Sequence, residues 1–296
     1  MNTEMLFEVC ASELESLKEF FPGEDLLFKL TGVAAEDKPL TNTIILAKRK
    51  IPEQAFLKEM ECIIVARDSI TLCVKGKSKC RSLKADTFKS VYSNIVNECV
   101  AKASKTPTKH ISSKSLIGAN TYIGNNVQIG HCVVVGANCI IKDNVAIGNN
   151  VVIEDNCVIR SNDADCYISA QGQRMTVPHI AGVSIEDGCL ILSGATIAAG
   201  VGKATQIGKR ALVGTKAIIA HNTVIGDDCL INAGATVCGY CSIGDCVYIG
   251  AGAIIKNRVT IENNSFVGIG SVVTRRVRQG DKVFGNPARK LEWEEA

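Results

Sequence analysis

Residues 207–225 read IGKRALVGTKAIIAHNTVI, with Ile or Val at every sixth position. The same spacing runs from Ile111 to Ile159, resumes from Ile185 to Ile197, and continues from Ile207 to Val273. All twenty-four positions are Ile or Val, and eleven of them are followed directly by glycine. A period of six fits neither an α-helix nor a coiled coil, whereas glycine and Asn/Asp pairs are typical of tight turns between short strands. Three six-residue sides would close a triangular coil of eighteen residues, which predicts a parallel β-helix of about eight coils.

Two interruptions break the repeat. Twenty-six residues separate Ile159 from Ile185, and ten separate Ile197 from Ile207. In a solenoid such insertions leave the repeat as loops, which often build binding surfaces.

The rest of the chain lacks the six-residue period. Residues 1–105 predict a small α/β domain, a candidate for nucleotide binding, with helices near 11–21 and 87–103 and strands near 43–47, 62–66 and 70–74. A linker follows over 104–109. We therefore expect a mainly β protein with three parts: the small domain at 1–105, the β-helix at 106–278 and a C-terminal tail at 279–296.

Composition narrows the possible partners and the location. A net charge of +3 and a pI near 8.1 are too mild to indicate nucleic-acid binding, so small molecules or proteins are the expected partners. The sequence begins without a secretion signal, and no stretch is apolar enough for an integral membrane segment, so we expect a cytoplasmic protein. Its fourteen cysteines are then expected to be reduced thiols.

The cysteines and histidines allow a metal hypothesis. Cys238 and Cys241, with Cys246 nearby, have a spacing seen in zinc sites. The repeat offers a simpler interpretation, because Cys241 occupies an inward position that Thr, Val or Ala fills elsewhere. The same holds for four further cysteines at Cys139, Cys157, Cys189 and Cys229. The four histidines, His110, His131, His179 and His221, are too dispersed for a three-histidine site, so no metal is predicted.

His221 is the strongest candidate for catalysis. Gly239 follows it by eighteen residues, one full coil, so the two are predicted to be stacked neighbours. A histidine beside an accessible glycine amide supplies a general base and an oxyanion donor in one place.

The order of these features resembles the UDP-3-O-acylglucosamine N-acyltransferases of lipid A synthesis. The resemblance rests on the leading domain, both interruptions, the pattern Thr205-x-Ile207-Gly208 after the ten-residue break, and Ile-Ala-His-Asn at 219–222. It implies a left-handed β-helix, His221 as general base, Gly239 as oxyanion donor and Asn222 as the companion of the histidine. It also implies a homotrimer with active sites between subunits, a leading domain that helps bind uridine, and no tightly bound cofactor.

Two departures from that family concern the substrate. Gly214-Thr215 stands where the family has an Asp-Asn pair, and Arg258 stands where it has a further histidine. The stretch 283–290 resembles the closing signature of hexapeptide transferases that use acetyl-CoA, and six residues follow it. That second resemblance suggests a CoA site, whose candidate residues are Gly268, Arg275, Arg276, Asn286, Pro287 and Arg289.

The sequence thus predicts an N-acyltransferase that moves an acyl group, preferably acetyl from CoA, to a nucleotide-linked amino sugar for surface polysaccharide or glycolipid. One alternative is a lipid A N-acyltransferase that takes a 3-hydroxyacyl chain from acyl carrier protein. A non-catalytic β-helix scaffold is another. The sugar, the choice between nitrogen and oxygen as acceptor, and the acyl length stay open.

Overall fold

The computed structural model describes residues 9–22, 26, 29–30, 32–35, 43–47, 61–66, 69–74, 77–83, 87–102, 109–169 and 171–290. The chain divides into two compact units. The first comprises Met1–Thr106, Ala164–Ala181 and Val201–Lys203. The second comprises Pro107–Asp163, Gly182–Gly200 and Ala204–Ala296.

The first unit is a small α/β structure. Its central sheet has the order β3-β4-β5-β6-β7, in which β3, β4 and β5 are parallel, β6 is antiparallel to β5, and β7 is antiparallel to β6. Its elements are β1 (Val9–Cys10), the 3-10 turn η1 (Ala11–Glu13), α1 (Glu15–Phe20), β2 (Lys29–Leu30), β3 (Gly32–Ala35), β4 (Thr43–Leu46), β5 (Cys62–Val65), β6 (Ser69–Val74), β7 (Lys77–Ser82), α2 (Phe88–Lys102), β17 (Cys166–Ile168) and β18 (Arg174–Thr176). The predicted helices and strands are confirmed to within a few residues at their ends.

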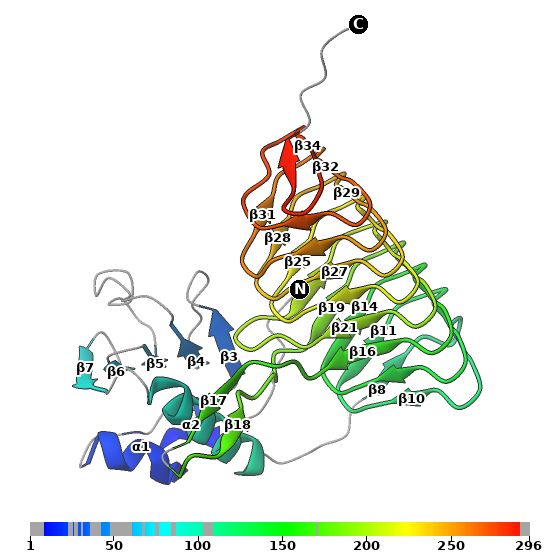
Figure 1. The fold of residues 1–296 in the computed structure, drawn as a ribbon. Coiled ribbons are helices and arrows are strands. Elements are labelled where there is room, and N and C mark those ends of the chain that lie inside the picture. The colour runs from blue at the N-terminus through cyan, green and yellow to red at the C-terminus, as the bar shows by residue number, and fades with distance from the viewer. Residues whose placement is uncertain are drawn as a thin grey trace, which may run out of the picture. The chain divides into compact units, whose positions relative to one another are not determined.

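The second unit is a parallel β-helix with three sheets, as predicted (Figure 1). The first sheet contains β10 (Tyr122–Ile123), β13 (Ile140–Ile141), β16 (Val158–Ser161), β21 (Thr196–Ala198), β24 (Ile218–Ile219), β27 (Thr236–Val237), β30 (Ile254–Ile255) and β33 (Val272–Val273). The second contains β8 (Lys109–Ile111), β11 (Val127–Ile129), β14 (Val145–Ile147), β19 (Val183–Ile185), β22 (Thr205–Ile207), β25 (Val224–Ile225), β28 (Ser242–Ile243) and β31 (Thr260–Ile261). The third contains β9 (Leu116–Ile117), β12 (Val134–Val135), β15 (Val152–Ile153), β20 (Leu190–Ile191), β23 (Leu212–Val213), β26 (Leu230–Ile231), β29 (Tyr248–Ile249), β32 (Phe266–Val267), β34 (Lys282–Phe284) and the antiparallel β35 (Arg289–Lys290).

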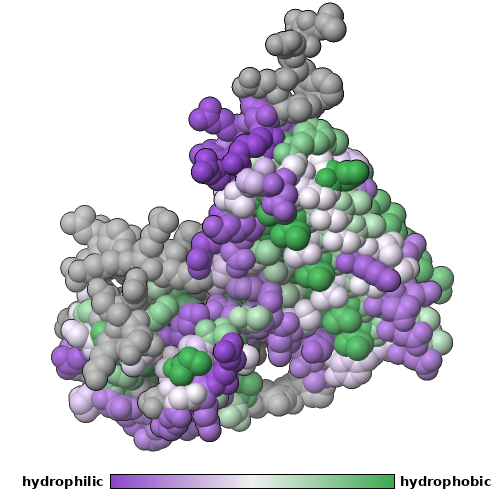
Figure 2. All heavy atoms as spheres, viewed as in Figure 1, coloured by the Kyte–Doolittle hydropathy of each residue, from purple (hydrophilic) through white to green (hydrophobic). Residues whose placement is uncertain are grey.

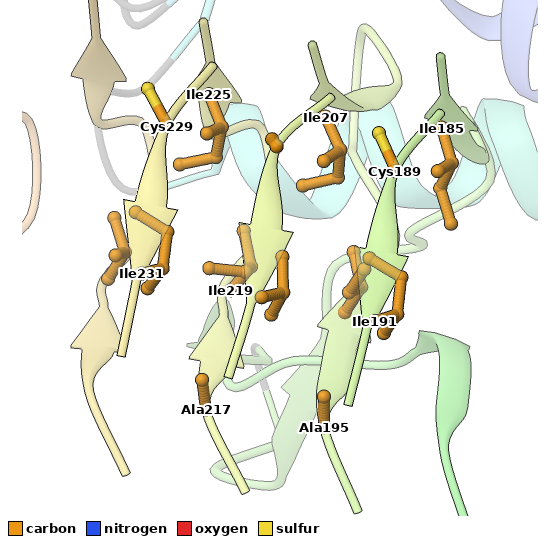
Figure 3. Packing of buried hydrophobic residues seen from close by; sticks show 14 of the residues in the cluster. Ile185, Cys189, Ile191, Ala195, Ile207, Ala217, Ile219, Ile225, Cys229 and Ile231 are labelled. Atoms are coloured by element: carbon orange, nitrogen blue, oxygen red, sulfur yellow. The ribbon is translucent and has the colours of Figure 1, made fainter. Parts of the chain in front are cut away.

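Strand register follows the eighteen-residue coil. Ile219 pairs with Val237, and the interruption before it makes Ile197 pair with Ile219 across twenty-two residues instead. Each coil therefore places its Ile or Val directly above the one before. Figure 3 shows these isoleucines stacked in the interior beside small residues such as Ala195 and Ala217.

The inward cysteines lie in this interior as predicted. Cys139, Cys157, Cys189, Cys229 and Cys241 are each at most 2% exposed. The Cys241 thiol donates to the carbonyl oxygen of Lys256 at 3.2 Å, and burial raises its pKa to about 11. Cysteine acts here as a small apolar residue that fills the core.

The structure differs from the predicted division of the chain in two places. β34 pairs in parallel with β32, so residues 279–290 extend the stack beyond the predicted coils instead of forming a separate tail. Parts of both interruptions belong to the first unit, because Val177 and Val201 are buried in its core together with Tyr92.

Two surface properties of the described residues bear on function. Figure 2 shows exposed apolar side chains on the visible face of the β-helix, separated by polar residues. None of the helices in the described part of the chain combines the length and hydropathy of a membrane span.

Candidate active site

Both interruptions begin at the edge of the β-helix that also holds His221. The interruptions begin where β16 and β21 end, and the next turns along the same sheet hold His221 after β24 and Gly239 after β27. Arg258 follows β30 and Arg275 follows β33. We call this column of turns after the first-sheet strands the His221 edge. Because the coils stack in register, this edge brings together residues that are far apart in the sequence. Ile159 and Arg275 are 116 positions apart.

The side chain of His221 is held in one tautomer. The residue is 6% exposed, and its Nδ1 lies 3.1 Å from Oδ1 of Asn222. Because an amide oxygen only accepts hydrogen bonds, this contact requires a proton on Nδ1. The lone pair of the neutral imidazole then lies on Nε2, which is the arrangement that a general base requires.

Gly239 lies directly against Nε2. A Cβ built on Gly239 would come within 2.6 Å of Nε2, so the ring fits only because this residue is glycine. The Gly239 carbonyl accepts the Arg258 N–H at 3.0 Å. Among the described residues, no hydrogen bond uses the Gly239 N–H. The His221 ring therefore lies against Gly239, one coil away, as the eighteen-residue spacing predicted.

The backbone of the His221 turn is held by residues from the interrupted part of the repeat. Asp163 Oδ2 accepts the His221 N–H at 3.2 Å, and Thr205 Oγ1 accepts the Asn222 N–H at 3.0 Å. Asn222 has a φ of 59°, a left-handed conformation that Asn tolerates better than most residues. Asp163 was missed in the sequence, because its place in an irregular loop carries no periodic signal.

Tyr240 and Arg258 form one side of the site. The Tyr240 ring meets the His221 ring edge-on, with centroids 4.7 Å apart and planes at 84°. The Arg258 guanidinium lies 5.2 Å from the centroid of Tyr240, within the range of a cation–π contact. Tyr240 was missed in the sequence, although its position eighteen residues after Asn222 would have placed it beside the histidine.

The cysteines of this region do not share one environment. Cys241 points into the core, whereas Cys238 is half-buried on the His221 edge. Burial and the nearby charge of Asp163 raise the pKa of the Cys238 thiol, which disfavours the thiolate that a metal or a nucleophile would need. No group of three His, Cys, Asp or Glu side chains suited to a metal occurs within the described residues.

The other three histidines lie elsewhere. His110 and His131 are exposed in the second unit, and His131 Nδ1 lies 2.8 Å from Ser112 Oγ. His179 is buried in the first unit. Of the four, His221 is the histidine whose ring lies against a glycine one coil away.

The candidate CoA residues separate into two groups. Arg275 and Arg276 lie on the His221 edge, three coils beyond His221, which at about 4.8 Å per coil is about 14 Å away. Arg276 donates to Glu262 Oε1 at 2.6 Å, while Arg275 is exposed.

The second group lies at the end of the third sheet. Asn286 and Pro287 form the turn between β34 and β35, and Arg289 belongs to β35. The Phe284 ring occupies the space that a Cβ of Gly268 would need. The Gly268 N–H donates to the backbone carbonyl of Val283 at 2.9 Å. Packing against Phe284 accounts for this glycine, and the structure does not bring these four residues to the His221 edge.

Models of known protein families agree with the fold. The family model described as bacterial transferase hexapeptide (six repeats) matches residues 114–149 and 204–239, and the hexapeptide repeat of succinyl-transferase matches 240–275. The repeats and the β-helix define the class of fold: the chain contains the hexapeptide repeats described for bacterial transferases, as predicted. No curated protein sequence matches the chain.

Solved structures of three acyltransferases are similar to this chain. UDP-N-acetylglucosamine acyltransferase from Campylobacter jejuni has 21% identity and a TM-score of 0.51 over 63% of this chain and 73% of its own. UDP-N-acetylglucosamine O-acyltransferase (LpxA) from Moraxella catarrhalis has 28% identity and a TM-score of 0.47 over the same shares. Perosamine N-acetyltransferase from Caulobacter crescentus, a mutant form solved with CoA and GDP-perosamine, has 15% identity and a TM-score of 0.29 over 69% of this chain and 64% of its own. The Campylobacter likeness shows a shared fold.

Proposed function

We propose that this chain transfers an acyl group, acetyl from CoA, to the amino group of a nucleotide-linked amino sugar. One observation carries the proposal. The Nδ1 of His221 is bound by Asn222, so its Nε2 lone pair faces Gly239, whose N–H has no acceptor among the described residues. An acyl transfer between a thioester and an amine needs a proton acceptor and an oxyanion donor in this relation.

The proposed reaction uses the two groups in sequence. The acceptor nitrogen attacks the thioester carbonyl carbon while Nε2 of His221 takes a proton from that nitrogen. The carbonyl oxygen becomes an oxyanion and accepts the Gly239 N–H. The carbon–sulfur bond then breaks, the imidazolium returns its proton to the thiolate, and an amide and a free thiol leave. Asn222 keeps the imidazole in the productive tautomer throughout.

Positive charge along the His221 edge supports an anionic donor and acceptor. Arg258 and Arg275 are both exposed on this edge. A CoA thioester and a nucleotide sugar both carry phosphates, for which the arginine guanidinium is the best protein partner. The resemblance of 283–290 to acetyl-CoA-dependent transferases favours CoA over acyl carrier protein. The first unit is proposed to bind the nucleotide.

We further propose a homotrimer in which a neighbouring copy completes the site. Ile218 and Ile254 project outward from β24 and β30 and are 44% and 43% exposed. They lie on the sheet that leads directly into the His221 edge, so a copy packed on this face would bury apolar surface beside the catalytic turn. Analytical ultracentrifugation should give three times the chain mass, and a monomer at micromolar concentration would contradict this assembly.

The function is tested by assaying the purified chain with two donors and a panel of UDP-linked and GDP-linked amino sugars. For each donor, acetyl-CoA or 3-hydroxyacyl-acyl carrier protein, the assay measures the free thiol that is released and the mass of the product. Transfer should occur with acetyl-CoA, and His221→Ala should lower kcat by about 10²–10⁴. His131→Ala is the matched control. Turnover with the carrier-protein donor alone would favour the lipid A reaction, and no transfer with any donor would favour a scaffold.

A further inference from the structure

The His221 turn lacks two hydrogen bonds that hold many regular turns of the β-helix. In such a turn the second residue after the strand donates its N–H to the side chain one coil further on. Asp227 Oδ1 accepts from Lys209 at 2.7 Å, and Asp245 Oδ1 accepts from Asp227 at 2.9 Å. The same contact joins Asn125 to Asp143, His131 to Asn149, Ala137 to Asp155, Asn149 to Asp187 and Asp245 to Asn263.

At His221 this acceptor is missing for a chemical reason. The residue one coil further on is Gly239, which has no side chain, and a Cβ there would strike Nε2. The glycine that makes room for the imidazole therefore removes the usual partner of the His221 N–H. Asp163, from the first interruption, supplies the acceptor at 3.2 Å.

The next amide of the turn is also held differently. In regular turns this residue donates its N–H to a backbone carbonyl in the turn one coil earlier, as Tyr240 does to His221 and Asp228 does to Lys209. For Asn222, the turn one coil earlier is interrupted by the ten-residue break. The hydroxyl of Thr205, which is fully buried, accepts the Asn222 N–H at 3.0 Å instead.

We propose that Asp163 and Thr205 are positioning residues that hold the His221–Asn222 turn, and that this is a function of the two interruptions in the repeat. The inference rests on the proposed role of His221. Asp163 binds the backbone of His221 and Thr205 binds the backbone of Asn222, so both act on catalysis through the orientation of the imidazole. A small displacement of a catalytic group lowers the rate of the chemical step more than it lowers substrate binding.

Variants at Asp163 separate a hydrogen-bond role from a charge role. Asp163→Asn keeps an acceptor oxygen and removes the charge, whereas Asp163→Ala removes both. We expect Asp163→Ala to lower kcat about tenfold with KM changed less than about twofold, and Asp163→Asn to stay within about threefold of the wild type. Equal losses in both variants would contradict positioning by the hydrogen bond.

Thr205 offers a second, nearly isosteric test. Thr205→Val keeps the shape and removes the hydroxyl, and Thr205→Ser restores the hydroxyl. The valine variant should lose about tenfold in kcat and the serine variant should recover most of it. Asp245→Ala is the matched control, because it removes the same kind of side-chain-to-backbone contact at a regular turn, and it should leave kcat unchanged.

Two readouts keep this inference separate from the proposed function. Nitrogen-15 NMR of the imidazole reports on the turn without substrate. A lower population of the Nδ1-protonated tautomer is expected in both Asp163→Ala and Thr205→Val, and an unchanged spectrum would overturn the inference. If His221→Ala retains full activity, the proposed function fails and the NMR result alone decides whether the two residues hold the turn. If His221→Ala is inactive while both variants keep wild-type kcat, the positioning role is wrong.

Discussion

Two edges of the same β-helix differ in how their turns are held. Along the edge that follows the second sheet, backbone N–H groups of Lys209, Asp227 and Asp245 donate to side chains one coil further on, at 2.7, 2.9 and 3.0 Å. We call this the ladder edge. Along the His221 edge this contact occurs at Asn125, whose N–H donates to Asp143. At His221 and Asn222 the acceptors of the N–H groups come instead from residues of the two interruptions. Both edges have the same strand register, so the difference lies in the side chains and loops.

This difference indicates how a regular solenoid can provide room for a candidate active site. On the ladder edge the repeat satisfies its own amides and leaves little for a ligand to bind. On the His221 edge, glycine in place of an acceptor makes room for Nε2 of His221, and no hydrogen bond among the described residues uses the Gly239 N–H. The stacked isoleucine core beneath both edges keeps the coils in place, so the irregular turn needs only local support.

Among the variants that keep His221, the largest effect is expected from closing the space beside this proposed base. Gly239→Ala would place a methyl group 2.6 Å from Nε2, and the imidazole would have to move. We expect kcat to fall about a hundredfold, because a displacement near 1 Å disrupts the reacting geometry. Steady-state kinetics with acetyl-CoA measures this loss.

Gly214→Ala provides the contrast for that variant. Its Cβ would meet the backbone of Ala233 and Asn232 at 2.6 Å, on another edge of the β-helix. Overpacking of backbone should lower the free energy of unfolding by about 1–3 kcal/mol and leave kcat of the folded protein unchanged. Both variants are compared by chemical denaturation, and a stability loss in Gly239→Ala equal to that in Gly214→Ala would weaken the assignment of Gly239.

A smaller effect is expected from removing the hydrogen bond between Asn222 Oδ1 and Nδ1 of His221. Asn222→Gly suits the left-handed backbone, since φ is 59°, but removes the acceptor of the Nδ1 proton. We expect kcat to fall about tenfold, in line with the loss of one hydrogen bond worth about 1 kcal/mol. Asn222→Asp keeps the acceptor and should retain most of the activity. Similar losses in both variants would show that the turn, not the tautomer, matters.

The smallest effect is expected on the ladder edge. Asp227→Ala removes the acceptor of the Lys209 N–H from a half-buried position. The free energy of unfolding should fall by about 0.5–1.5 kcal/mol, with kcat unchanged. Thermal unfolding measures the loss of stability, and the acyl-transfer assay measures kcat. A fall in kcat would mean that the ladder edge also takes part in the reaction.

The sequence predicted the β-helix well because each coil repeats one short rule. Ile or Val every six residues determines the strands, and counting eighteen residues per coil is enough to place Gly239 beside His221. Tyr240 and Arg258 follow from the same arithmetic. Asp163 does not, because the twenty-six-residue step from Ile159 to Ile185 breaks the period and leaves no register that links Asp163 to a distant turn. The grouping of 164–181 with the first unit was missed for the same reason.

The central claim is that His221 is the base of an acyl transfer at the His221 edge, and kcat of a His221→Gln variant tests it most directly. Glutamine keeps a polar side chain at this position but has no basic nitrogen, so it cannot take the proton from the acceptor amine. With acetyl-CoA as donor, kcat should fall by about 10²–10⁴ relative to the wild type, while circular dichroism shows the β-helix retained. A wild-type kcat in His221→Gln would contradict the account.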